Sequence, residues 1–168
     1  MNDEQNLTEI DAQKLPDTVA LQDDFTREFI ASPEEVEEGY YLFESKTGGY
    51  TMWYPKNAKL SPTYYQKKKD YFEALHVGGY NDQTTGDSFY IRATYGDSKD
   101  TKDTDIYLYL LSSSIHYDGE YEKVETDDKI IYFATMKNIT NNKTKNKKAS
   151  AYRFFGLIKS NDSDQALR

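Results

Sequence analysis

The segment 40–55 constrains the fold of this chain most strongly, because it reads as two strands joined by a tight turn. Two aromatic-rich runs with high β propensity, 39–46 and 49–54, flank a Thr-Gly-Gly sequence at residues 47–49. These residue types suit a hairpin turn that requires positive φ. Pro55 ends the second run, since proline has no N–H group to donate into a continuing ladder. With a period of two, one face of this run carries Tyr50, Met52 and Tyr54, and the other carries Thr51 and Trp53.

The composition agrees with an acidic, sheet-rich domain. Tyrosine supplies 16 of the 168 residues against 8 phenylalanines, and it suits half-exposed sheet faces, where the ring packs and the hydroxyl stays hydrated. The formal charge of −8 argues against a nucleic-acid partner, which normally requires a basic surface. The chain has no cysteine, which excludes disulfides, thiol chemistry and cysteine-based zinc sites.

The polarity of the chain predicts one domain between two tails. Residues 1–17 are predicted to form a flexible polar tether, residues 18–160 a single domain, and residues 161–168 a frayed C-terminal tail. At the start of the domain, Asp17 and Thr18 can cap a helix that runs from Val19 to about Ile30, with one apolar stripe and with Arg27 among the polar residues opposite.

The remaining segments alternate in the way that strands do, with one exception. Strands are predicted at 71–77, 88–95, 120–125, 129–136 and 149–159, and a basic loop at 138–148 connects the last two. The segment 106–115 fits a helix and a strand equally well, and the acids at 103–105 favour a helix because they can cap it. This order predicts an α+β fold, an antiparallel sheet with helices packed on it.

The sequence Gly-Tyr-Thr-Met-Trp-Tyr-Pro at residues 49–55 resembles the start of Mog1/PsbP-like domains, in which a Gly-Tyr-(Thr/Ser)-Met-x-(Tyr/Phe)-Pro segment lies on an early strand. The resemblance implies an α/β/α sandwich. The chain also resembles the mature ectodomains of small Gram-positive lipoproteins of unknown function, in which a lipid-bearing cysteine precedes a polar tether. The resemblance to Mog1/PsbP-like proteins implies a binding or assembly factor and supplies no catalytic residue.

Candidate catalytic and metal-binding groups are sparse. His76 and His116 are 40 positions apart, and structural roles are favoured for both. No Gly-x-Ser-x-Gly sequence positions a nucleophile, so a hydrolase with an unrecognised site is the least favoured alternative. Four acids in the loop Asp97–Asp105 leave calcium binding open, although their spacing does not match an EF-hand; they are Asp97, Asp100, Asp103 and Asp105.

Two sets of residues are candidates for contact with a partner. Exposed tyrosine and tryptophan anchor many interfaces, and the aromatic candidates are Trp53, Tyr54, Tyr64 and Tyr65. Lysine clusters can face an anionic surface or protect a sheet edge; these lysines are Lys67, Lys68, Lys69, Lys143, Lys145, Lys147 and Lys148.

These observations predict a non-catalytic binding or assembly domain without a cofactor. It is expected to belong to an exported protein that a lipid anchor outside this sequence holds at the membrane, and to contact a protein or an envelope component. No nucleic acid is expected as a partner. The alternative is a cytoplasmic protein-binding scaffold of Mog1 type.

Overall fold

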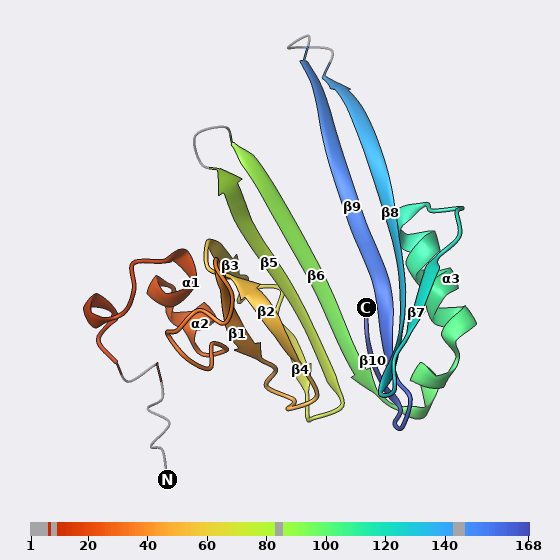
Figure 1. The fold of residues 1–168 in the computed structure, drawn as a ribbon, viewed down its shortest axis with the longest axis horizontal. Coiled ribbons are helices and arrows are strands. Elements are labelled where there is room, and N and C mark those ends of the chain that lie inside the picture. Colours follow the sequence, from red (N-terminus) through yellow and green to blue (C-terminus); the bar gives the residue numbers. More distant parts are fainter. Residues whose placement is uncertain (1–6, 8–9, 83–85, 143–146) are drawn as a thin grey trace. The chain divides into compact units, whose positions relative to one another are not determined.

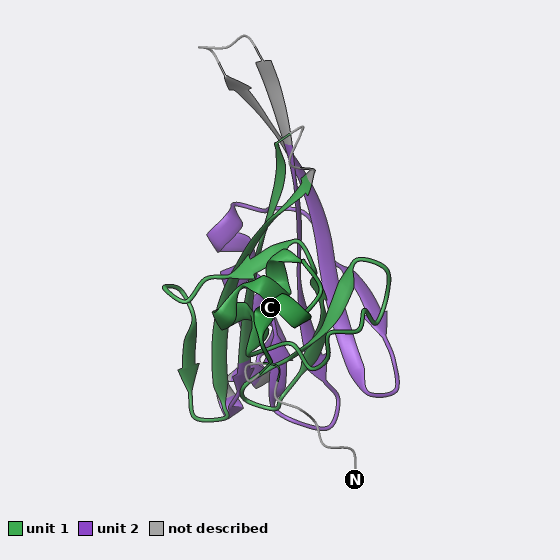
Figure 2. Cartoon of the chain, turned by 90° about the vertical axis from the view of Figure 1, so that its left-hand side faces the viewer, with its two compact units in different colours: residues 1–95 green, residues 96–168 purple. Residues whose placement is uncertain are grey.

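The computed structural model describes residues 7, 10–82, 86–142 and 147–168, and of residues 82, 100, 102, 138–142 and 147–150 the backbone alone. The chain divides into two compact units, residues 1–95 and 96–168 (Figure 2). This division differs from the predicted single domain 18–160. The described ends also differ from the predicted tails, because Leu7 and Leu15 are buried and the last residues form a strand.

Unit 1 contains two short helices followed by strands (Figure 1). In chain order its elements are η2 (Ala12–Lys14), α1 (Val19–Gln22), α2 (Asp24–Arg27), β1 (Tyr40–Glu44), β2 (Thr51–Pro55), β3 (Ala58–Leu60), β4 (Gln66–Lys68), β5 (Phe72–Asp82) and β6, which spans Asp87–Asp97 and so ends just past the unit boundary. Strands β3 and β4 each pair antiparallel with β5, and β5 neighbours β6.

The predicted helix from Val19 to Ile30 is broken in the structure. Asp23 has an extended backbone, with φ −92° and ψ 116°, and therefore separates α1 from α2. Its carboxylate accepts a 3.0 Å hydrogen bond from the Thr26 backbone N–H, which caps α2. A mid-helix aspartate that can cap a new helix competes with continuation of the old one. The helix was therefore predicted correctly at its start and wrongly in its length.

The aromatic hairpin is confirmed. Strands β1 and β2 pair antiparallel with Tyr41 opposite Tyr54, and Gly48 in the turn has φ 72°. Tyr54 is buried and Trp53 is exposed, so the predicted alternation of faces is also confirmed. Ring packing then joins the hairpin to the helical segment, since Phe43 stacks on Phe29 with 5.4 Å between ring centroids.

Strands β5 and β6 are the two long strands of unit 1, with 11 residues each. Glu73, Leu75 and Val77 of β5 are buried on one face, as the alternation of this run predicts. The strand continues through Gly78 and Gly79 to Asp82, where the sequence predicted an end. The buried face of β5 packs under the hairpin, because the Glu73 side chain hydrogen bonds to residues of the β1–β2 loop.

Unit 2 contains one described α-helix and a sheet with the strand order β10-β9-β8-β7. Asp103 caps the helix by accepting a 3.0 Å hydrogen bond from the Ile106 backbone N–H, so the predicted capping and helix are confirmed. The ring of Phe155 packs edge-on against those of Tyr117 and Tyr121, which follow the helix in the chain. The elements of unit 2 are η3 (Lys99–Lys102), α3 (Thr104–Ile115), β7 (Glu122–Glu125), β8 (Lys129–Asn142), β9 (Lys147–Ser160) and β10 (Gln165–Leu167).

Two predictions about unit 2 are corrected. The predicted basic loop 138–148 is mostly strand, because β8 and β9 stay paired out to Asn142 and Lys147. Residues 165–167 form β10 on β9 in place of a frayed tail, and Ala166 is buried there. Antiparallel sheets with a few helices in both units confirm the α+β class, while the α/β/α sandwich stays a prediction. Within the described residues, no helix has both the length and the apolar character needed to cross a bilayer.

Candidate functional site

The face of β5 and β6 opposite the hairpin carries exposed aromatic and cationic side chains. Because side chains alternate along a strand, the neighbours of the buried Leu75 and Val77 point to this opposite face. We call this surface the tyrosine face, and it consists of Tyr64, Lys68, His76, Tyr80, Tyr90 and Arg92. The three tyrosines are more than half exposed, at 59% for Tyr64, 53% for Tyr80 and 58% for Tyr90.

Three aromatic rings at the centre of the tyrosine face pack against one another. The Tyr64 ring, from the segment between β3 and β4, stacks on His76 with 5.0 Å between centroids and 23° between planes. Tyr90 meets His76 edge-on at 5.5 Å, and its hydroxyl shares a hydrogen bond with His76 Nδ1. The contacts hold the two tyrosine rings in fixed orientations while much of each ring stays in water, which suits stacking against a ligand.

The charge of the tyrosine face is positive. Lys68 lies over the ring of Phe72, with Nζ 5.6 Å from the centroid, and Arg92 follows Tyr90 by two positions on the same face of β6. Neither Lys68 nor Arg92 has a carboxylate partner within the described residues. Burial and the charge of Arg92 lower the pKa of His76, so the imidazole is neutral at pH 7.

The middle of the tyrosine face is open backbone. Gly78 lies between His76 and Tyr80 on the outward side of β5, and a Cβ built at Gly78 would meet no atom within 4 Å. His76 and Tyr80 are four strand residues apart, about 13 Å. A planar ligand can therefore lie flat on the strand between these two aromatic side chains.

The aromatic residues predicted to bind a partner do not form one group. Tyr64 belongs to the tyrosine face, and Trp53 is exposed on the hairpin against the ring of Tyr40. Both stay predictions. Tyr54 is fully buried, and the prediction for it is wrong because it lies on the core side of β2. The hydroxyl of Tyr65 points inward to Glu73, which removes its polar end from any partner.

The predicted lysine surface is also divided. Lys67 pairs with Asp70 at 3.3 Å, whereas Lys68 lies on the tyrosine face. Lys69 is exposed in the turn after β4, with φ 48°. The other predicted lysines fall outside the described side chains: Lys143 and Lys145 lie outside the described residues, and Lys147 and Lys148 are described by backbone alone.

Sequence reasoning missed most of the tyrosine face. The alternation at 88–95 placed Tyr90 and Arg92 on one side, but it did not indicate which side is exposed. His76 was expected to be structural, and Tyr80 was placed beyond the end of its strand. The available signal was the alternation of β5, in which Leu75 and Val77 fall on one face while His76, Gly78 and Tyr80 fall on the other.

Unit 1 also buries a carboxylate. Glu73 is fully buried, and Oε2 accepts hydrogen bonds from Ser45 Oγ at 2.7 Å and from the Tyr50 hydroxyl at 2.8 Å. Oε1 accepts from the Lys46 backbone N–H at 3.1 Å and from the Tyr65 hydroxyl at 2.8 Å. Burial, followed by the hydrogen bond and the charge of Glu73, raises the pKa of Tyr50 and Tyr65, so both hydroxyls stay protonated donors. Saturation of both oxygens suits a structural clamp better than a reacting acid.

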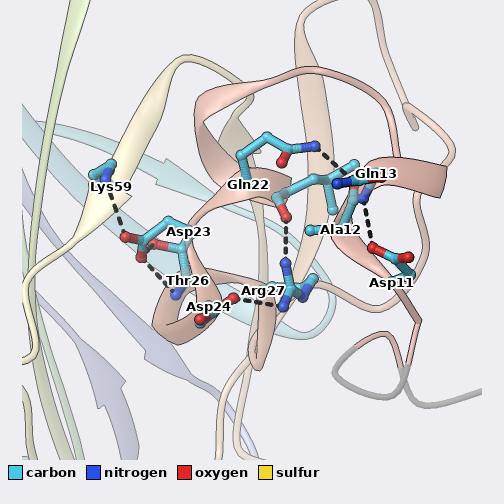
Figure 3. Close-up of polar contacts among 10 residues, drawn as sticks. Asp11, Ala12, Gln13, Gln22, Asp23, Asp24, Thr26, Arg27 and Lys59 are labelled. Atoms are coloured by element: carbon cyan, nitrogen blue, oxygen red, sulfur yellow. Dashed lines mark hydrogen bonds and ion pairs between the residues drawn. The ribbon is translucent and has the colours of Figure 1, made fainter.

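A second polar cluster holds the helical segment of unit 1 (Figure 3). Arg27 is buried and donates to the Leu21 carbonyl at 2.8 Å and to the Asp24 carboxylate at 2.6 Å, although the sequence predicted it on the polar side. Asp23 accepts from Thr26 and pairs with Lys59 of β3 at 3.1 Å. These contacts join α2 to α1 and to β3, and the Arg27 Nε is buried without a hydrogen-bond partner among the described residues.

The remaining candidate groups are used locally. Asp103 caps α3, and Asp97 accepts a 3.4 Å hydrogen bond from Gln165, so these two acids of the predicted calcium loop have separate roles. The side chain of Asp100 lies outside the described part of the loop. His116 is exposed and ends α3 with φ 57°. Among the described side chains, no group of three or more histidines and acids could hold a metal ion.

Comparison with known proteins places the chain in a family. Residues 16–168 match the family model YvcA_Mog1p, described as "Putative lipoprotein YvcA", and the chain belongs to this family. The resemblance to Mog1-like proteins and to a small lipoprotein is thereby confirmed. One relative is the protein named "Putative lipoprotein YvcA" of Bacillus subtilis (strain 168), which is 31% identical over 157 residues. The match covers 93% of the chain and 64% of that protein's length. No solved structure matches the chain.

Proposed function

We propose that the chain is the non-catalytic binding domain of an exported lipoprotein, and that it contacts a component of the cell envelope through the tyrosine face. The observation that carries the proposal is the packed aromatic set Tyr64, His76 and Tyr90, whose rings are held in place and yet exposed. Aromatic side chains that are fixed before binding contribute contact area at low cost in conformational entropy. Membership in a lipoprotein family supports the location.

Two measurements test the proposal. Metabolic labelling of the full native gene product with an alkyne palmitate analogue, followed by membrane fractionation, should recover acylated protein in the membrane. The purified chain should sediment with washed envelope, and a Tyr64→Ser/Tyr90→Ser variant should stay in the supernatant. Unlabelled protein in the cytoplasm would overturn the location, and equal sedimentation of the two proteins would overturn the role of the face.

A cytoplasmic scaffold of Mog1 type is the second candidate, and one observation favours it. Trp53 is 60% exposed on a hairpin that is rigidly packed through Tyr54 and Phe43, and exposed tryptophan is enriched at protein interfaces. A native gene product that stays unacylated in the cytoplasm, with a cytoplasmic protein partner that the Trp53→Ala variant loses, would support this reading. A hydrolase remains the least favoured alternative, because the Ser112 hydroxyl hydrogen bonds with the Tyr121 hydroxyl and the Ser114 hydroxyl donates to the Leu111 carbonyl. Among the described residues, neither hydroxyl bonds to the His116 imidazole.

A further inference from the structure

We propose that the tyrosine face binds an anionic glycopolymer, meaning a chain of sugar units that carry phosphate or carboxylate groups. The inference rests on the proposed function, since it names the class of envelope component that the face recognises. It combines three properties of the face: exposed rings, cations without a carboxylate partner, and an open strip of backbone between the rings.

The exposed rings can hold sugar units. The faces of sugar rings present C–H groups that pack on aromatic rings, and the aromatic ring then needs one open face and a fixed orientation. Tyr64 and Tyr90 satisfy both conditions, because each packs against His76 and remains more than half exposed. Tyr80, about 13 Å further along β5, offers a second ring at a spacing that spans more than one sugar unit. The open backbone at Gly78 lets a chain lie across the strand between them.

The charges select an anionic chain. The protein carries a formal charge of −8, yet the described outward side chains of β4, β5 and β6 include the cations Lys68 and Arg92 and no acid. A local positive face on an acidic protein steers an anionic partner to this surface and repels it elsewhere. Arginine and lysine bind phosphate and carboxylate groups well. The positive charge lies beside the stacking rings, so one repeating unit can use both.

A lipid surface fits the face less well. Proteins that insert into a bilayer interface present aliphatic side chains or tryptophan that enter the acyl region. Within the described residues, the outward side of β5 and β6 has no leucine, isoleucine or tryptophan, and its one phenylalanine, Phe72, is half-buried with Lys68 over its ring. Each exposed ring of the tyrosine face carries a polar atom. The flat face with polar rims suits a hydrated polymer.

The test compares probes that separate ring stacking from charge. Binding of the 168-residue chain is measured by calorimetry with polygalacturonate, with glucosylated poly(glycerol phosphate), with neutral dextran, with polyglutamate, and with vesicles of phosphatidylcholine and phosphatidylglycerol. One of the two anionic glycopolymers should bind at least about tenfold more tightly than dextran or polyglutamate, because only it engages both rings and charges. Binding should weaken as salt is added.

Variants locate the binding on the tyrosine face. Tyr64→Ser should lower the affinity about tenfold, whereas Tyr64→Phe, which keeps the ring, should leave it within about twofold. Arg92→Gln and Lys68→Gln should each lower it about fivefold. Gly78→Val should abolish binding without unfolding the protein, since its side chain enters open space on a strand that tolerates β-branching. The control Lys67→Gln removes a lysine already paired with Asp70 and should change little.

The outcomes separate this inference from the proposed function. Sedimentation with envelope that depends on Tyr64, without binding to either anionic glycopolymer, would overturn the inference and keep the function. Tighter binding to vesicles or to polyglutamate than to the glycopolymers would also overturn it, in favour of a lipid or an acidic peptide. If every variant of the tyrosine face still bound the envelope as tightly as wild type, both the inference and the proposed function would be overturned.

Discussion

Ser45 Oγ lies 2.7 Å from Glu73 Oε2, and this hydrogen bond joins the hairpin loop to the buried side of β5. Both oxygens of Glu73 accept hydrogen bonds. Glu73→Gln replaces one of these oxygens with an amide NH2 group, which cannot accept and therefore meets other donors without a partner. We expect the variant to lose about 3 kcal/mol of unfolding free energy, the usual cost of an unmatched buried polar group in a network. Urea unfolding monitored by tyrosine fluorescence measures the loss.

A conservative variant separates the carboxylate from the packing around it. Tyr65→Phe keeps the ring that packs on Phe29 at 5.1 Å and removes one donor to Glu73. The expected loss is about 1 kcal/mol, since the Lys46 N–H still donates to the same oxygen. A Tyr65→Phe variant that is as unstable as Glu73→Gln would contradict the assignment of Glu73 as the centre of the network.

The Asp23 cap predicts a loss of stability in acid. Burial alone raises the pKa of Asp23, but the hydrogen bonds from Thr26 and the ion pair with Lys59 outweigh burial and hold the pKa below the ordinary 3.8. A carboxyl with a lowered folded pKa stabilises the protein above 3.8, and this contribution is lost as the pH falls through the folded pKa. Wild type should therefore exceed Asp23→Asn in unfolding free energy at neutral pH, and the gap should close below pH 3.8. A gap that persists at lower pH would refute the linkage.

Local chemistry made part of the fold predictable. The hairpin follows from Thr-Gly-Gly between two alternating runs, and helix α3 follows from Asp103, whose side chain caps it as predicted. Both signals lie within a few residues of the structure that they determine. The break at Asp23 has a local signal as well, but a capping aspartate inside an apolar stripe fits one long helix or two short ones until Lys59 pairs with it.

Long-range pairing decided the rest. Strand β10 is only three residues long, and it forms because β9 offers an edge to residues 165–167. The alternation of β5 and β6 is visible in the sequence, yet which side faces water depends on the hairpin that covers Glu73 from 28 positions away. The alternation could therefore place Tyr90 and Arg92 on one side of a strand, whereas the exposure of that side and its grouping with Tyr64, His76 and Tyr80 could not be predicted. Tyr54 is a second example: the sequence placed it on the same face as Tyr50 and Met52, but it did not indicate that Tyr54 is buried.

Glycine at position 49 is required by the packing of Tyr95. A Cβ at Gly49 would overlap the end of the Tyr95 ring, which is buried and packs on Tyr50. We expect Gly49→Ala to destabilise the protein by about 2 kcal/mol, the usual effect of overpacking. Gly78→Ala is the matched control, because its Cβ meets nothing within 4 Å, and it should change the unfolding free energy by less than about 0.5 kcal/mol. Equal effects of the two substitutions would contradict the packing at Tyr95.

His76 predicts that binding to an anionic glycopolymer strengthens in mild acid. The groups that face its ring are Tyr64, Tyr90 and Arg92, and burial together with the Arg92 charge lowers its pKa from 6.5. Protonation as the pH falls through that lowered pKa adds a positive charge to the face, so polygalacturonate affinity should rise several-fold as the pH is lowered from neutral through the pKa of His76. Isothermal titration at each pH measures the change.

Substitution of each histidine, together with the titration of His76 itself, identifies the histidine responsible for the pH dependence of binding. His76→Gln should remove the rise in affinity, whereas His116→Asn, which suits the left-handed backbone at φ 57°, should keep it. By linkage, bound polymer must favour the imidazolium and shift the NMR-measured pKa of His76 upward. In the free protein, acid weakens folding while it strengthens polymer binding. The lowered pKa of His76 stabilises the fold above pH 6.5, and this stability is lost as the pH falls and His76 becomes protonated. An affinity that is flat with pH, or a His76 pKa that polymer does not move, would place the anionic partner away from this ring.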